Sequence, residues 1–273
     1  MANSFNKINL EAEYVRSMVI KNGYFFLSNF IQEDRLGLLI DAFDKLHGLT
    51  HNLYSSNHVS SQYDPNSGIR LLTNTNSTQI ILDALSTSES KTYPRGKFTR
   101  YLPSSYADLL DLDLLYKITD LYFGAEGIFG TRMQFIRSQK TKSAEKIPFI
   151  PHYDRIRSLK FYFYLTHVGE PDGALAVEKF GSTIIENERK RFEQFSANTP
   201  WNRITGEVTD AKTRKLTGKP GDLIIFDSNH THLHGMNTSG KTRKVFMIES
   251  QTKKDIQHGY NTKLSMELTH KNI

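Results

Sequence analysis

The feature that most constrains the fold is a change of sequence pattern near residue 127. Before it, apolar residues recur at the spacing of amphipathic helices. The helices expected there cover 9–21, 31–48, 77–86 and 105–124. After it come short runs rich in β-branched and aromatic residues, separated by turn residues, at 127–139, 158–168, 173–180, 222–228, 231–237 and 243–252. Helices followed by a series of strands predict an α+β protein whose strands form a sandwich or a barrel.

The remaining segments complete this outline. Residues 23–30 predict a short strand, and the polar residues 50–78 predict a loop. A long polar insertion at 182–219, with its own helical piece at 184–195, interrupts the strand region. Such insertions often face a substrate, and Trp201 within this one is a candidate contact, although packing explains it equally well.

The chain shows no internal repeat and no linker rich in Pro or Gly, so a single domain is expected over 1–273. Its expected parts are a mainly helical N-terminal part, a β core that carries the insertion, and a C-terminal tail, with bounds at 1–126, 127–252 and 253–273.

Charge and hydropathy limit the partners. The net charge is +6 and the pI is near 9.2, but Lys and Arg are scattered and no signature of a nucleic-acid module is found. No apolar run approaches the roughly 18 residues that span a bilayer. Residues 1–17 contain no apolar signal core. We therefore expect a cytoplasmic protein that acts on a small molecule, with neither nucleic acid nor membrane as partner; its oligomeric state is not readable here.

Two short motifs carry the candidate chemistry. The sequence has no cysteine, so a metal site here would use His, Asp and Glu. His152 and Asp154 in "PHYD" are two residues apart, and on a strand this spacing places both side chains on one face. A surface His beside an Asp that pairs with a nearby Arg fits the same letters. In "NHTHLHG", His230, His232 and His234 also alternate, so all three can line one pocket.

Two histidines and one carboxylate form the facial triad of non-haem iron(II) oxygenases, which leaves coordination positions for cosubstrate and oxygen. Arg243 opens the apolar run 243–252, where a guanidinium can hold a carboxylate in a bidentate grip. A cupin site and a metallo-β-lactamase-like zinc site also begin with His-x-His. The acid that each needs is missing: Met236 and Asn237 stand where the cupin Glu would be, and "HTHLHG" has no Asp.

Over most of its length the chain resembles the phytanoyl-CoA dioxygenase-like group of iron(II)/2-oxoglutarate oxygenases. Residues 22–46 resemble the opening strand, turn and helix of that family, and "PHYD" matches its His-x-Asp motif. Residues 161–183 resemble the two strands that follow, and 221–243 resemble the closing block with the distal His and the cosubstrate-binding Arg. The resemblance implies a double-stranded β-helix (jelly-roll, cupin-like) core with the N-terminal helices packed outside it.

Within this resemblance, intervals select the distal His. The family usually places it six residues after the last Phe of an apolar strand, with Asn, Ser and Arg five, seven and about eleven residues beyond it. These intervals fit His232, and the residues that keep the spacing are Phe226, Asn237, Ser239 and Arg243. His230 and His234 fit worse, and His230 is expected to be a bystander in the pocket or at the surface.

The resemblance also implies the site roles. Iron(II) is expected on His152, Asp154 and His232, and 2-oxoglutarate on Arg243, with O2 as the other cosubstrate. Further candidates for contact with 2-oxoglutarate are Ser239, Gln134 on the strand before "PHYD", and His234, which stands where the family often has Ser. Gly181-Ser182-Thr183 departs from the Gly-Ser-His usual in the family, which weakens any transfer of substrate identity.

The expected activity is oxidation, hydroxylation foremost, of a small polar or anionic metabolite with release of succinate and CO2. Because Asp154 is a carboxylate rather than Ala or Gly, no ligand position is open for chloride, which disfavours halogenation. Desaturation and cyclisation use the same ligands and stay open. The alternative is a non-catalytic or differently metallated cupin-like binding protein on the same barrel.

Overall fold

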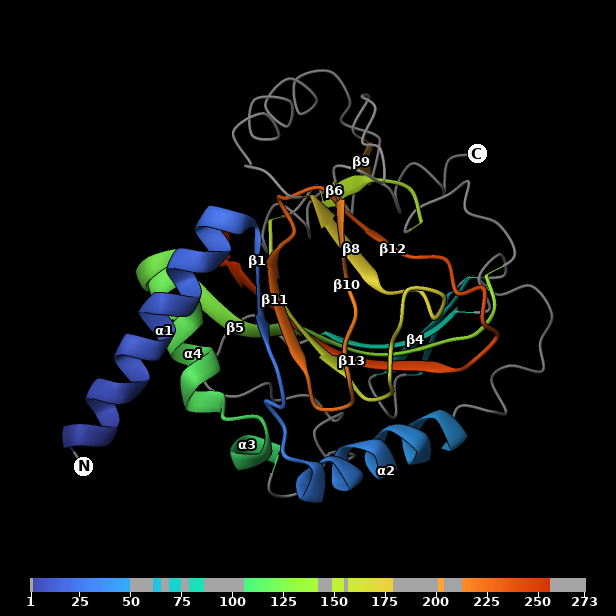
Figure 1. The fold of residues 1–273 in the computed structure, drawn as a ribbon, viewed down its shortest axis with the longest axis horizontal. Coiled ribbons are helices and arrows are strands. Elements are labelled where there is room, and N and C mark those ends of the chain that lie inside the picture. The colour runs from blue at the N-terminus through green and yellow to red at the C-terminus, as the bar shows by residue number, and fades with distance from the viewer. Residues whose placement is uncertain are drawn as a thin grey trace.

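The computed structural model describes residues 2–49, 61–64, 69–74, 79–85, 106–141, 149–154, 157–178, 201–203 and 213–255. Helices lie beside two antiparallel sheets (Figure 1). The helices are α1 (Ala2–Asn22), α2 (Glu33–Leu49), α3 (Tyr106–Leu109) and α4 (Leu112–Phe123), followed by the 3-10 turn η3 (Gly124–Glu126). In the part of the chain described, none is both long and apolar enough to cross a lipid bilayer.

The larger sheet has eight strands in the order β1-β11-β7-β13-β5-β4-β3-β2. Their bounds are β1 (Tyr24–Leu27), β2 (Ser61–Asp64), β3 (Ile69–Asn74), β4 (Gln79–Leu85), β5 (Gly127–Ser138), β7 (Leu159–Tyr164), β11 (Leu223–Asp227) and β13 (Arg243–Thr252). The smaller sheet has five strands in the order β10-β8-β12-β6-β9. They are β6 (His152–Asp154), β8 (Leu175–Glu178), β9 (Trp201–Arg203), β10 (Thr213–Leu216) and β12 (His232–His234).

Alternation along the central strands of the larger sheet divides its side chains between two cores. On β7, Phe161 and Phe163 belong to the core under the helices, which also holds Phe43 of α2. Tyr162 and Tyr164 point the other way, into the core shared with the smaller sheet. Burying one such aromatic ring stabilises the fold by about 2 kcal/mol. The space between the two sheets is therefore filled from both sides, and the polar residues of the site lie within it.

Most helix predictions are confirmed. α1 contains the helix expected over 9–21, and α2 matches the one expected over 31–48 but begins two residues later. α1 ends at Asn22, and the φ of +81° at the next residue, Gly23, suits glycine. The segment 105–124 contains α3 and α4, and the Asp111 carboxylate caps α4 by accepting from the Leu114 amide at 3.3 Å. The strand expected over 23–30 is β1, which pairs with β11.

The predictions for residues 50–86 are wrong wherever the structure describes them. Instead of a loop over 50–78 and a helix over 77–86, β2, β3 and β4 extend the larger sheet beyond β5. The apolar run at 80–82 is too short for its periodicity to separate helix from strand, so pairing with β5 decides. The helix expected at 184–195 lies outside the described residues.

Candidate metal centre

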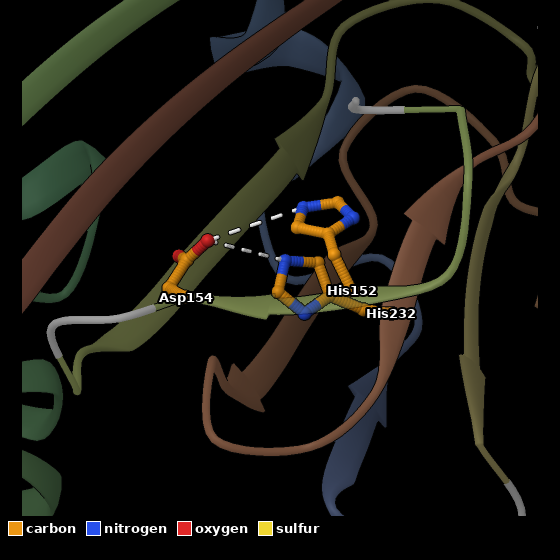
Figure 2. A group of neighbouring side chains, drawn as sticks. All are labelled: His152, Asp154 and His232. Atoms are coloured by element: carbon orange, nitrogen blue, oxygen red, sulfur yellow. Dashed lines mark ion pairs between the residues drawn. The ribbon is translucent and has the colours of Figure 1, made fainter. Parts of the chain in front are cut away.

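His152 and Asp154 are the two ends of β6, and His232 is the first residue of β12. Because these strands are antiparallel neighbours with His232 opposite His152, the three side chains gather on one side of the smaller sheet. One potential ligand atom from each residue lies within 4.8 Å of the others. Figure 2 shows both imidazoles facing Asp154, and their ring centroids are 4.5 Å apart. The fold thus brings together the three residues selected from the sequence.

Both imidazoles are held in the tautomer that metal binding requires. His152 Nδ1 lies 2.8 Å from the carbonyl oxygen of Ile150, and His232 Nδ1 lies 2.9 Å from that of His230. A carbonyl oxygen only accepts, so each Nδ1 carries the proton and each Nε2 carries the lone pair. Burial lowers the pKa of His152, and it lowers the pKa of His232 to about 3. Both rings are therefore neutral at pH 7.

Asp154 uses its two oxygens differently. Its Oδ2 accepts from the Lys160 ammonium. Its Oδ1 lies 4.0 Å from Nε2 of His152 and 3.8 Å from Nε2 of His232 (Figure 2). Among the residues described, this buried Oδ1 accepts no hydrogen bond. Burial acts to raise the pKa of Asp154, but Lys160, His232 and His152 together outweigh burial, and the pKa falls to about 2. The carboxylate is therefore ionised at neutral pH.

This donor set fits a divalent metal ion. A buried charged oxygen with no hydrogen bond costs folding free energy unless a cation satisfies it. Two neutral imidazole nitrogens and one carboxylate oxygen are ligands that suit iron(II) and other first-row divalent ions. The hydrogen bonds to the two Nδ1 atoms fix the ring orientations, as the outer partners of metal-bound histidines do.

The turn after β11 links the strands that carry the candidate metal ligands. Asp227 Oδ2 accepts from the Tyr122 hydroxyl at 2.5 Å and pairs with Arg157 Nη2 at 3.1 Å. In the next position, the Ser228 carbonyl accepts from the Asp154 amide at 2.9 Å. Because Tyr122 lies on α4, one short turn connects a helix, the end of β6 and the approach to β12.

His230, in the same turn, contributes to the centre through its backbone. Its carbonyl accepts from His232 Nδ1, while the residue as a whole is 2% exposed and its ring packs against Gly23. A Cβ atom added at Gly23 would lie 2.4 Å from His230 Nδ1, so this contact needs a glycine. The His230 carbonyl thus orients the ring of the candidate ligand His232, and the expectation that His230 is itself no ligand stays a prediction.

Arg243 begins β13, and its side chain is only 2% exposed. Its Nε donates to Ser138 Oγ at 3.0 Å, and its Nη1 donates to the carbonyl oxygen of Gly173. Among the described residues, Arg243 thus donates to a hydroxyl and to a carbonyl, and not to a carboxylate. A guanidinium has five donors, and a buried cation of this kind favours an anionic partner. Arg243 is thus suited to bind a carboxylate.

The positive charge of Arg243 acts on His234. This histidine is half-buried at the end of β12, on the same strand face as His232, with its ring centroid 6.1 Å from that of Tyr162. Burial and then the positive charge of Arg243 lower the pKa of His234 well below its ordinary value. A neutral imidazole on the strand face of His232, within the electric field of the Arg243 guanidinium, is compatible with the predicted contact to a cosubstrate.

Gln134 and Ser239 lie in different surroundings. Gln134 is buried on β5. In the amide orientation that suits both its oxygen and its nitrogen, the oxygen accepts from Arg132 Nη2 at 2.6 Å. Ser239 is exposed in the turn after β12, where its hydroxyl donates to Asn237 Oδ1 at 3.2 Å. Their roles toward a cosubstrate stay predictions, and the contacts of Ser239 serve the turn.

Lys160 is the residue that sequence reasoning missed. It lies on β7, holds Asp154 Oδ2, and has its Nζ 3.7 Å from Glu249 Oε1 and 5.7 Å from the centre of the Phe226 ring. Burial alone would lower the pKa of Lys160, but Asp154 and then Glu249 raise it, so the amine is charged. The available signal was a lysine inside the aromatic run 158–168, because a buried lysine is almost always paired.

The insertion at 182–219 reaches this centre through its backbone. Trp201 begins β9, which pairs with β6 so that Trp201 lies opposite Asp154. The other end of the insertion forms β10, beside β8. Residues 182–200 and 204–212 lie outside the described part of the chain.

Comparison with known proteins gives a likeness of fold. No protein-family model matches the chain, and no curated protein sequence does. Among solved structures, the epimerase SnoN in complex with Fe3+, alpha ketoglutarate and nogalamycin RO has a TM-score of 0.52 at 10% identity, over 89% of this chain and 84% of that chain. EvdO2 from Micromonospora carbonacea var. aurantiaca, complexed with 2-oxoglutarate, has a TM-score of 0.53 at 16% identity, over 88% of this chain and 90% of that chain.

A prolyl hydroxylase from Trichoplax adhaerens, in complex with a hypoxia inducible factor peptide fragment, gives a TM-score of 0.52 at 14% identity, over 93% of this chain and 95% of that chain. Each likeness covers most of both chains, so the whole two-sheet architecture is shared rather than a fragment. The fold and the site together define a two-sheet protein with a His-Asp-His centre suited to a metal ion.

Proposed function

We propose that the chain is a non-haem iron(II)/2-oxoglutarate-dependent oxygenase of the phytanoyl-CoA dioxygenase-like group, with a double-stranded β-helix core. The observation that carries the proposal is the buried triad of His152, Asp154 and His232. Backbone carbonyl groups hold the Nδ1 atoms of both histidines, and Asp154 Oδ1 has no hydrogen bond among the described residues. The β-helix is supported by topology, because β5, β6, β7 and β8 alternate between the two sheets, as do β11, β12 and β13.

The names of the solved structures support the choice of cofactors. SnoN was captured with Fe3+ and alpha ketoglutarate, and EvdO2 with 2-oxoglutarate. In this chain iron(II) would be held by the triad, and Arg243 would bind the far carboxylate of 2-oxoglutarate. Iron(II) and 2-oxoglutarate together supply the activation of O2, with release of succinate and CO2, for the oxidation of a substrate C–H bond.

The residues around the triad have defined tasks in this proposal. Ile150 and His230 orient the two imidazoles through their carbonyl groups, Arg243 and His234 orient the cosubstrate, and the aromatic core on β7 excludes water. Hydroxylation of a small polar or anionic metabolite is the outcome we propose. SnoN is an epimerase and SnoK a carbocyclase, so the same fold carries other outcomes in those proteins.

Succinate formation tests the proposal. Purified protein with iron(II), ascorbate, 2-oxoglutarate and a metabolite panel should release succinate, and a substrate should raise the rate above the uncoupled background. Asp154→Ala and His232→Ala should reduce this release to the level without protein, because each removes one ligand of the triad. Unchanged succinate release by either folded variant would refute the assignment.

A further inference from the structure

Among the described residues, four charged side chains form one network that includes Asp154 of the triad. Lys160 Nζ contacts Asp154 Oδ2 and lies 3.7 Å from Glu249 Oε1, and Arg132 Nη1 lies 3.8 Å from the same Glu249 oxygen. The side chains of Lys160, Asp154 and Glu249 are 11%, 9% and 7% exposed. Solvent and salt therefore screen these charges weakly.

In this network the two oxygens of the Asp154 carboxylate have different neighbours. Lys160 engages Oδ2 and leaves Oδ1 facing the two imidazoles. Lys160 cannot easily leave this position, because Glu249 and the face of the Phe226 ring are close to its ammonium. One oxygen is thus held by a protein cation, and the other is directed at the place where a metal ion would lie.

Among the described residues, the charges of the network cancel. Lys160 and Arg132 each carry one positive charge, Asp154 and Glu249 each carry one negative charge, and both imidazoles are neutral. A divalent ion bound by the triad would therefore keep an almost uncompensated double positive charge. Such an ion gains little from Coulomb attraction to its ligands, and much from a dianion that binds beside it.

We propose that Lys160 is a positioning residue that couples the metal to an anionic cosubstrate. It orients Asp154 and cancels its charge, so that a divalent metal binds weakly alone and more tightly together with a dianionic 2-oxo acid. The claim that the metal binds weakly alone rests only on the triad and its charge network. The claim that a dianionic 2-oxo acid tightens metal binding rests on the proposed function.

The test measures the dissociation constant of Mn(II) by calorimetry or electron paramagnetic resonance, with and without 2-oxoglutarate. Lys160→Met should bind Mn(II) alone about tenfold more tightly, because the site gains one net negative charge. The tightening that 2-oxoglutarate causes should fall about tenfold in the same variant, because the dianion meets less positive charge. Lys160→Arg should behave like the wild type, since it restores the charge.

Lys215→Met is the matched control, because it removes an equal charge from the ion pair with Glu170 at the surface. It should leave both constants unchanged. Glu249→Gln is the reciprocal variant and should weaken the binding of Mn(II) alone, which keeps the test decisive if Lys160→Met does not fold. Circular dichroism and thermal melting establish that each variant is folded.

A purely structural role gives a different result. If folded Lys160→Met weakened both the binding of Mn(II) alone and the response to 2-oxoglutarate, or changed neither, the proposal would be overturned. If the wild type bound Mn(II) with no response to 2-oxoglutarate, the proposed function would fail instead. Opposite shifts in Lys160→Met and Glu249→Gln for Mn(II) alone would still support the charge-setting role of Lys160.

Discussion

The three alternating histidines at 230–234 differ in what surrounds their rings. His232 donates from Nδ1 to the His230 carbonyl and directs Nε2 toward Asp154. His230 packs its ring against Gly23, and the charge of Arg243 acts on the ring of His234. Equal spacing in the sequence thus gives one metal-binding candidate, one residue that orients it through a carbonyl, and one neighbour of the proposed cosubstrate.

His47 of α2 gives a prediction for the dependence of stability on pH. The residue is 4% exposed, and its ring lies 4.4 Å from the Phe43 ring, centroid to centroid. Burial, and then the positive charge of Arg137, lower its pKa from 6.5 to about 4. The unfolded chain therefore binds a proton before the folded chain does. The stabilisation is complete above pH 6.5 and is lost as the pH falls from there toward 4.

The contribution of His47 should amount to about 2 kcal/mol of lost stability at pH 5. His47→Leu removes the titrating ring and should flatten the pH profile by that amount, relative to the wild type. Urea unfolding at several pH values, with EDTA present so that metal binding is uncoupled, measures the difference. Parallel profiles for the two proteins would show that His47 is not responsible.

The turn from β7 to β8 positions the side chain of Arg243. Gly173 has a φ of +86°, and its carbonyl accepts from Arg243 Nη1. A Cβ atom at this position would lie 2.8 Å from the Gly235 carbonyl oxygen and 3.2 Å from Arg243 Nη1. A side chain there would therefore displace the turn, the end of β12 and the guanidinium together.

Gly173→Ala should raise the concentration of 2-oxoglutarate needed for half-maximal turnover roughly fivefold, the equivalent of about 1 kcal/mol for one disturbed hydrogen bond. Metal affinity should stay unchanged. Gly240→Ala is the control, because Gly240 also has a positive φ of +77° but no atom within 4 Å of an added Cβ. Steady-state kinetics compare the two variants, and an equal effect in both would attribute the change to backbone strain instead.

The pattern of elements shows why some predictions succeeded. α1, α2 and α4 are long enough for their apolar periodicity to be read, whereas the apolar run at 80–82 is not. β4 is a strand because β5 pairs with it, and the residues of β4 do not encode that neighbour. The same limit applies to β2 and β3, which continue the sheet through polar segments.

At the site, too, local sequence patterns do not reveal contacts between strands that are far apart in the chain. The spacing in "PHYD" and around His232 selects the triad, because those residues share strand faces and resemble a known arrangement. Lys160 and Glu249 escaped attention because their partners come from other strands, and only the facing of the two sheets brings their charges to Asp154. Predicting them would require the pairing of β7 with β13, which no local pattern supplies.

The central claim is that one iron(II) binds to His152, Asp154 and His232. Anaerobic equilibrium binding of iron(II), with 2-oxoglutarate present, tests it most directly. We predict one iron per chain in the wild type and in His230→Gln, and none in Asp154→Ala or His232→Ala. Full iron binding by folded Asp154→Ala or His232→Ala, or loss of iron in His230→Gln alone, would contradict the assignment of the ligands.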